Sequence, residues 1–184
     1  MKKNKLAWRD VKTILADKEN SEIFKLIGDL YALSDENKTF VHSRYSIGDN
    51  PLKPYQDIIS DALYPDVMCN QPIQLSVGRK AISDYFKATK NKIGQLELMF
   101  HYVETGNQFT LDLGDIDESF YSSLESMFDR ILSTIKKQPK DIQIRCLPRL
   151  ENIVDSVHGM GWGYYDYLNQ TFYEFKAKAQ ETEN

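Results

Sequence analysis

The sequence predicts an all-α protein with seven or eight amphipathic helices. Apolar residues recur at three- and four-residue steps along most of the 184 residues, which is the period of a helix with one buried face. Glycine, proline and helix-capping residues fall mainly between these stretches. No stretch alternates convincingly between apolar and polar residues, and the nearest one, residues 71–77, has a proline near its start. Periodicity leaves two architectures open, an irregular bundle and a short stacked array of helical pairs.

Three helices are expected before residue 46. Residues 6–15 place their apolar side chains on one helical stripe. Ser21 can cap a second helix, whose apolar positions recur through residues 23–33. Ser34 can cap a third helix, which extends to about residue 45 and has acidic residues in its first turn.

The segment IGDNP at residues 47–51 combines glycine, turn-forming polar residues and proline, so it predicts a break in the chain. We expect one helical domain over residues 1–184, with a subdivision at the 46–51 turn as the alternative. A helix is expected over residues 52–63, followed by a loop over 66–73. Ser76 can cap the next helix, which extends to about residue 90.

Four more helices are expected in the second half of the chain. One begins near residue 93 and continues through Gly106 and Asn107 to residue 113. Residues 117–137 show the clearest pattern, with acidic residues at the start and lysines at the end. In the helix at 147–157, Pro148 either kinks the helix or marks its first turn. The last helix spans residues 164–175, and the tail is expected to fray from about residue 177.

The composition limits the functional classes. A formal charge of −4 and a pI near 5.4 disfavour a protein whose main task is to coat nucleic acid, because phosphate binding requires a concentrated positive field. Cys69 and Cys146 are the only cysteines, as expected in a reducing cytoplasm. The N-terminus lacks the apolar stretch of a signal peptide, and no apolar run approaches the roughly 18 residues that cross a bilayer. We therefore expect a cytoplasmic protein with no membrane partner.

Three stretches carry a resemblance to a known family. They are DLYALSDENKTFVHSR at residues 29–44, PLKPY at 51–55 and GWGY at 161–164. In these stretches the chain resembles a family of small all-helical bacterial proteins of unknown function, and the resemblance extends over most of the chain. It implies a bacterial, cytoplasmic and helical protein. It implies nothing about chemistry, because the family has no assigned activity.

No catalytic site is recognised in the sequence. Cys69, paired with one of the histidines His42, His101 or His158, offers the only thiol arrangement in a loop, and no local signature surrounds it. The acidic group at residues 112–118 lacks the ligand spacing of a calcium loop, so helix capping explains it better than metal binding. We expect no catalytic residues, no metal and no cofactor, and an enzyme ranks behind two binding functions.

Nucleic-acid binding is the alternative function. Basic clusters near residues 79–92 and 136–149 can contact phosphates. The second cluster consists of Lys136, Lys137, Lys140, Arg145 and Arg149. The net negative charge and the lack of a recognition motif favour an ordinary solvated face.

Protein binding is the preferred function, as a scaffold, an accessory subunit or a homodimer. The last helix carries aromatic residues around too much of its circumference for one buried stripe, so some of them are expected to meet a partner. The candidate binding residues are His158, Trp162, Tyr164, Tyr165, Tyr167 and Tyr173. The competing interpretation is that this helix is central and buried on most sides.

The glycines at 159, 161 and 163 do not have the spacing of a nucleotide-binding loop. They are expected to stop one helix, turn the chain and allow close packing of the next helix. The stretch therefore predicts a structural hinge between the last two helices, with Trp162 as its anchor.

Overall fold

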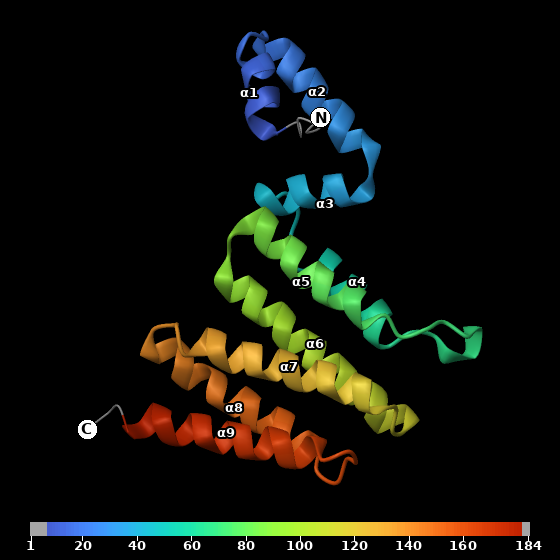
Figure 1. Cartoon of the computed structure of the whole chain (residues 1–184), viewed down its shortest axis with the longest axis vertical. Helices are drawn as coiled ribbons and strands as arrows, with labels where there is room; N and C mark the ends of the chain where they lie inside the picture. Colours follow the sequence, from blue (N-terminus) through green and yellow to red (C-terminus); the bar gives the residue numbers. More distant parts are fainter. Residues whose placement is uncertain (1–6, 182–184) are drawn as a thin grey trace, which may run out of the picture.

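The computed structural model describes residues 7–181, and this part of the chain is all-helical, as predicted (Figure 1). Within residues 7–181 there are nine α-helices, one short 3-10 helix (η1) and no strand. The elements are α1 (Trp8–Ala16), α2 (Asn20–Leu33), α3 (Asp35–Arg44), α4 (Lys53–Leu63), η1 (Val67–Cys69), α5 (Leu75–Thr89), α6 (Lys92–Leu113), α7 (Glu118–Ile135), α8 (Lys140–Ser156) and α9 (Tyr164–Glu181). The predicted start of the first helix at Leu6 lies outside the described residues.

Helices α4 to α9 pack like a bundle and contain the core. The central helix is α6, which packs against α4, α5, α7 and α8, while α9 packs against α7 and α8 (Figure 1). The largest fully buried side chains all come from these helices and include Ile59, Ile82, Tyr85, Phe100, Tyr102, Phe128, Tyr164 and Phe172. Each apolar stripe that the sequence predicts here faces a neighbouring helix, which is what holds the bundle together.

The strongest predicted helix, at residues 117–137, is confirmed as α7. Its N-cap is Asp117, whose side chain accepts a hydrogen bond from the backbone N–H of Phe120 at 2.9 Å. Hydrogen bonds from the Ser119 hydroxyl and the Phe120 N–H lower the pKa of the Asp117 carboxyl. Within the acidic group at 112–118, Asp117 therefore acts in helix capping, as predicted. Asp112 and Asp115 instead accept hydrogen bonds from the Tyr64 and Tyr121 hydroxyls.

The prediction that α6 continues through Gly106 and Asn107 is also confirmed. Gly106 lets α7 approach closely, because a Cβ at this position would lie 2.5 Å from the Leu124 side chain. Asn107 is buried and accepts a hydrogen bond from the Tyr164 hydroxyl at 2.7 Å, which joins α6 to α9. The Gly106–Asn107 segment is thus a site where α6 packs closely against its neighbours.

Several boundaries differ from the sequence prediction. Helix α5 begins at Leu75 with Gln74 in the N-cap position, so Ser76 is not its cap. Helix α8 begins at Lys140 and contains Pro148 in its interior, so the prediction that this proline marks a first turn is wrong. The buried residues of α8 are Leu150, Ile153 and Val154, whereas Ile142, Cys146 and Leu147 in its first half are only partly buried. The predicted loop at 66–73 contains η1, and α9 continues to Glu181, past the point where fraying was expected.

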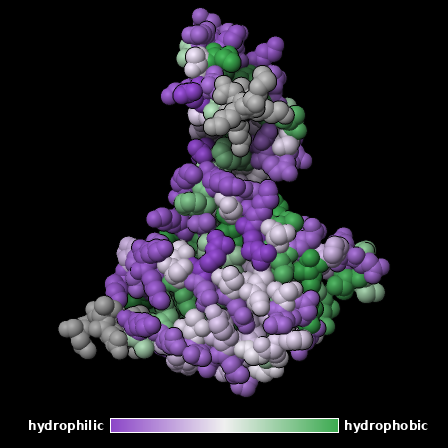
Figure 2. Space-filling model, viewed as in Figure 1, coloured by the Kyte–Doolittle hydropathy of each residue, from purple (hydrophilic) through white to green (hydrophobic). Residues whose placement is uncertain are grey.

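Helices α1 and α2 form a hairpin that projects from the bundle (Figures 1 and 2). Helix α2 packs against α3, and α3 packs against α5, but α1 has no extensive contact with any other described helix. Among the described residues before the 46–51 turn, Ser43 alone is buried. The hydrophobic core therefore begins after this turn, and the hairpin stands outside it.

Candidate protein-interaction surface

The apolar side chains of the α1–α2 hairpin are exposed. Neither helix has a buried residue. Trp8, Phe24 and Leu33 are 69%, 74% and 75% exposed. We define the hairpin face as Trp8, Val11, Ile14, Phe24, Leu26, Ile27, Leu30 and Leu33. Single exposed apolar residues are ordinary, but a group of this size on two adjacent helices is typical of an interaction surface.

Helical spacing groups these residues along each helix. In α1 the apolar positions are three and four residues apart and form one stripe, whereas in α2 they extend over about half of the circumference, from Phe24 to Leu33. The other side of α2 is polar and carries Glu22, Lys25 and Asp29. Both helices are therefore amphipathic, and neither has a core to cover its apolar side.

The short helix α1 lacks the contacts that usually stabilise a helix of its length. It has nine residues, and isolated helices shorter than about 12–15 residues are only marginally stable in water. Its local support includes the hydrogen bond from the Ala7 N–H to the Asp10 carboxylate at 2.9 Å. In proteins most helix stability comes from burial of an apolar face, and α1 buries none within residues 7–181. A partner on the hairpin face would supply that burial.

Polar contacts fix the hairpin to α3. The Tyr31 hydroxyl and the His42 Nε2 atom are 2.8 Å apart in a hydrogen bond, and their rings are in contact. The Asn37 amide donates to the Leu30 carbonyl oxygen at 2.6 Å, and Ser34 caps α3. His42 therefore has a positioning role between α2 and α3.

Arg44 in turn fixes α3 to the bundle. Its guanidinium donates hydrogen bonds to the backbone carbonyl oxygens of Ala88 and Lys87, at the C-terminal end of α5. These carbonyls have no partner within the helix, and a cation suits the negative end of the helix dipole. The hairpin is thus held at a defined position relative to the bundle.

A groove of about 590 Å³ lies between α3 and the α4–α5 pair. Its apolar lining includes Phe40, Ile58 and Val77, all partly exposed. On its rim, Asp84 accepts hydrogen bonds from the Lys80 ammonium at 2.6 Å and from the Lys87 ammonium at 2.8 Å. Asp35 and Glu36 of α3 also line the groove, so its apolar lining next to the hairpin is bordered by charges of both signs.

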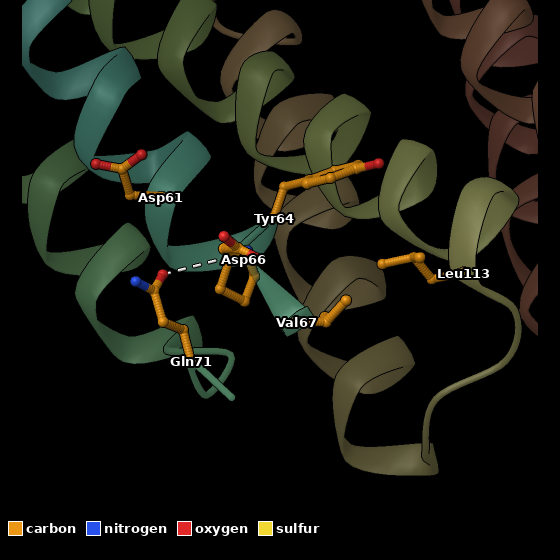
Figure 3. Close-up of a pocket in the computed structure, with 7 residues that line it drawn as sticks. Asp61, Tyr64, Asp66, Val67, Gln71 and Leu113 are labelled. Carbon is orange, nitrogen blue, oxygen red and sulfur yellow. Dashed lines mark hydrogen bonds between the residues drawn. The ribbon is translucent and has the colours of Figure 1, made fainter. Parts of the chain in front are cut away.

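A second depression, of about 450 Å³, lies at the other end of α4 (Figure 3). Asp61 of α4, Tyr64 directly after α4, Gln71 and Leu113 line it, and the Asp66 N–H donates to the Gln71 side-chain oxygen at 3.4 Å. Three of its polar side chains have partners inside the chain, since Gln71 accepts this bond, Tyr64 donates to Asp112 and Asp66 caps η1. The depression therefore shows no set of free polar groups directed at a ligand.

The predicted C-terminal binding residues divide into core and surface. Tyr164 is completely buried, so it belongs to the core and is not available to a partner. Burial raises the pKa of its hydroxyl well above the ordinary value. Tyr165 is partly buried, and its ring contacts the exposed His158 ring at a centroid distance of 4.7 Å.

The other three candidates on this side are exposed but scattered. Tyr167 donates a hydrogen bond to Asp129 at 2.8 Å, and this bond is the main reason that its pKa rises to about 12. Tyr173 is exposed and has the Lys176 ammonium over its ring. Trp162 is 59% exposed, so the prediction that it anchors the hinge is wrong; the buried anchor of the hinge is Tyr164. The backbone of Trp162 is in the left-handed region, with a φ of 59°.

The basic cluster at 136–149 is partly used within the chain. Arg149 donates hydrogen bonds to Glu97 at 2.5 Å and to both oxygens of Glu104 at 2.6 and 2.8 Å. Arg145 lies 3.7 Å from Asp141, and Lys136 lies over the Phe175 ring. Lys136, Lys137 and Lys140 are exposed around the α7–α8 turn.

In the other basic cluster, Arg79 donates a hydrogen bond to the Ser123 hydroxyl. Lys80 and Lys87 share Asp84, as described for the groove. Of these contacts, only the one with the Asp84 carboxylate offsets positive charge in this cluster, because the Ser123 hydroxyl is neutral.

The histidines and cysteines do not form a catalytic arrangement. The His101 Nε2 atom lies 2.9 Å from the Ser60 hydroxyl and 3.2 Å from the Gln56 carbonyl oxygen, so its neighbours are not carboxylates. Cys69 is an exposed free thiol, and burial raises the pKa of the free Cys146 thiol. Within the described residues there is no group of three or more His, Cys, Asp or Glu side chains that could hold a metal ion.

These observations define an all-helical protein whose most distinctive surface is an uncovered apolar hairpin. None of the helices in the described part of the chain combines the length and apolar composition that crossing a bilayer requires. Comparison with known proteins finds no family model, no curated protein and no solved structure that matches the chain.

Proposed function

We propose that the protein functions by binding another protein chain through the hairpin face. The observation that carries the proposal is the complete lack of buried residues in α1 and α2, two helices with strongly apolar sides. Covering such a surface removes apolar area from water, which is the main favourable contribution to most protein association. The bundle of α4–α9 would act as the scaffold that carries the hairpin. We include a cytoplasmic location in the proposal, and the two free thiols, Cys69 and Cys146, support it.

Nucleic-acid binding has no comparable support. Arg149, the most enclosed residue of the basic cluster at 136–149, is committed to Glu97 and Glu104. Neither the groove beside α3 nor the depression at the other end of α4 is lined by a basic residue of that cluster. We therefore propose a single function, protein binding.

Site-specific photocrosslinking in the native host tests the proposal. Phe24 would be replaced by a benzophenone amino acid in the full chain, and Lys25 would be replaced by the same amino acid in a matched control. Lys25 lies on the polar side of α2, and both positions are exposed. We expect protein–protein crosslinks from position 24 that are absent or much weaker from position 25. Equal crosslinking at both positions, or none at position 24, would refute the proposal.

A further inference from the structure

We propose that the partner on the hairpin face is a second copy of this chain, so that two α1–α2 hairpins form a four-helix bundle. The inference rests on the proposed function, because it assumes that the hairpin face binds protein. In Figure 1, α1 and α2 run in opposite directions and are joined by a short turn at residues 17–19. Helices α1 and α2 make few contacts with each other. Two antiparallel helices with exposed apolar sides can nevertheless contribute two members of a four-helix bundle, and a two-fold axis would supply the other two from the same sequence.

The exposed apolar area is sufficient for a stable dimer. Trp8 and Phe24 together present roughly 200–350 Å², because a whole aromatic side chain covers about 150–250 Å². The six aliphatic residues of the hairpin face are 41–75% exposed and raise the apolar area to the order of 600 Å². A standard interface buries about 800 Å² on each partner, of which about two thirds is apolar in homodimers. The hairpin face alone therefore meets the requirement of a standard dimer.

The charges of the hairpin also favour a second copy. Residues 8–33 carry four basic residues, Arg9, Lys12, Lys18 and Lys25, and five acidic residues, Asp10, Asp17, Glu19, Glu22 and Asp29, so their net charge is −1. A strongly basic or strongly acidic partner would find no complementary field on this surface, and neither would an anionic lipid surface. A second hairpin has the same nearly balanced charges, and an isologous interface can therefore pair opposite signs without net repulsion.

The chain's own bundle cannot cover the hairpin face. Helices α2 and α3 are separated by Ser34 alone, which caps α3. The Tyr31–His42 and Asn37–Leu30 hydrogen bonds fix the angle between these helices. The hairpin consequently projects from the bundle (Figures 1 and 2).

Sedimentation velocity of the purified full chain tests the inference. We expect reversible dimerisation between about 1 µM and about 200 µM. Phe24→Asp and Leu30→Asp should each raise the dimer dissociation constant by about a hundredfold or more, because two-fold symmetry places the charge in the interface twice. Lys25→Asp is the matched control and should remain dimeric, since Lys25 lies on the polar side of α2. Thermal unfolding of each variant, monitored by circular dichroism, checks that the bundle still folds.

The outcomes separate this inference from the proposed function. A wild-type chain that is monomeric at about 200 µM overturns the second-copy inference. In that case, crosslinks from position 24 to a different protein would leave the proposed function standing. A dimer that Phe24→Asp and Leu30→Asp do not weaken would also overturn the inference, because it would form through another surface. A dimer weakened by these two variants and not by Lys25→Asp supports it.

Discussion

Arg149 provides a sharp test of the packing between α6 and α8. It lies on α8 and donates three hydrogen bonds to Glu97 and Glu104 of α6, and its guanidinium lies 4.3 Å from the centre of the Phe100 ring. Partial burial alone would lower the pKa of this guanidinium, but the hydrogen bonds from its cation to the two carboxylates outweigh that effect and raise the pKa. We predict that Arg149 acts in stability rather than in phosphate binding.

Replacing Arg149 by Met keeps the apolar stem over Phe100 but removes the three charge-assisted hydrogen bonds. Hydrogen bonds to charged groups contribute about 1.5–3 kcal/mol each when buried. The side chains of Arg149, Glu97 and Glu104 are 34%, 44% and 37% exposed, so water screens the pairs and can hydrate the carboxylates that remain. We therefore expect a total loss of about 2 kcal/mol for Arg149→Met. Arg149→Lys should lose about 1 kcal/mol, since an ammonium cannot bind both oxygens of Glu104 side by side.

Urea unfolding monitored by circular dichroism measures these losses. The slope of the free energy against urea should stay unchanged while the midpoint falls. Arg145→Met is the control and should lie within about 0.5 kcal/mol of wild type, because Arg145 is exposed and forms only a long ion pair with Asp141. If Arg149→Met unfolds at the wild-type urea midpoint, the reasoning is refuted.

Three further predictions concern the core and the hinge. Burial, followed by a hydrogen bond to a carboxylate, raises the pKa of Tyr121 from 10.0 to about 12, so the neutral tyrosine stabilises wild type below pH 10 and this stabilisation is lost as pH rises to about 12. Tyr121→Phe should therefore lose less unfolding free energy over this pH range than wild type. Equal losses in the two proteins would contradict this. Gly94→Ala should destabilise the protein by about 1–3 kcal/mol in urea unfolding, because its Cβ would lie 2.0 Å from a buried tyrosine hydroxyl. Gly28→Ala, with nothing within 4 Å of its Cβ, should stabilise by up to about 1 kcal/mol, and equal effects at the two glycines would contradict the close-packing argument. In the same urea unfolding, Tyr164→Ala should lower the free energy of unfolding by about 3–5 kcal/mol and Trp162→Gly by less than about 0.5 kcal/mol. Similar losses in the two variants would show that Trp162 stabilises the hinge as much as Tyr164 does.

Helical periodicity predicted the fold class because the bundle helices bury one stripe each. The clearest case is α7, whose apolar positions and Asp117 cap are local features of the sequence. The start of α8 was predicted too late, although Ile142, Cys146 and Leu150 recur at four-residue steps, because the interior Pro148 suggested a first turn. A residue type that favours the N-cap position is also a weak signal by itself. Ser76 is such a residue, but Gln74 occupies the N-cap position of α5.

The proposed interaction surface could not be predicted in the same way. The apolar period at residues 23–33 predicted α2, but a stripe of apolar residues does not show whether another helix covers it. For the same reason, the sequence did not show which aromatic residues of α9 are buried. Phe172 and Phe175 are buried together with Tyr164, so much of this aromatic surplus is core, in line with the competing interpretation of a largely buried last helix. The sequence did contain one signal for an exposed apolar surface. The apolar residues of α2, from Phe24 to Leu33, extend over a wide arc of the helix, and they precede the 46–51 break.

The central claim is that a second copy of this chain covers the hairpin face, and hydrogen exchange in α1 and α2 tests it most directly. Wild type and Phe24→Asp would be compared at about 1 µM and about 200 µM. The account predicts that the amides of residues 8–33 exchange slowly in concentrated wild type, faster after dilution, and fast at both concentrations in Phe24→Asp, because α1 has no buried residue within the described part of the chain. Identical exchange of these amides in wild type and Phe24→Asp at both concentrations would contradict it.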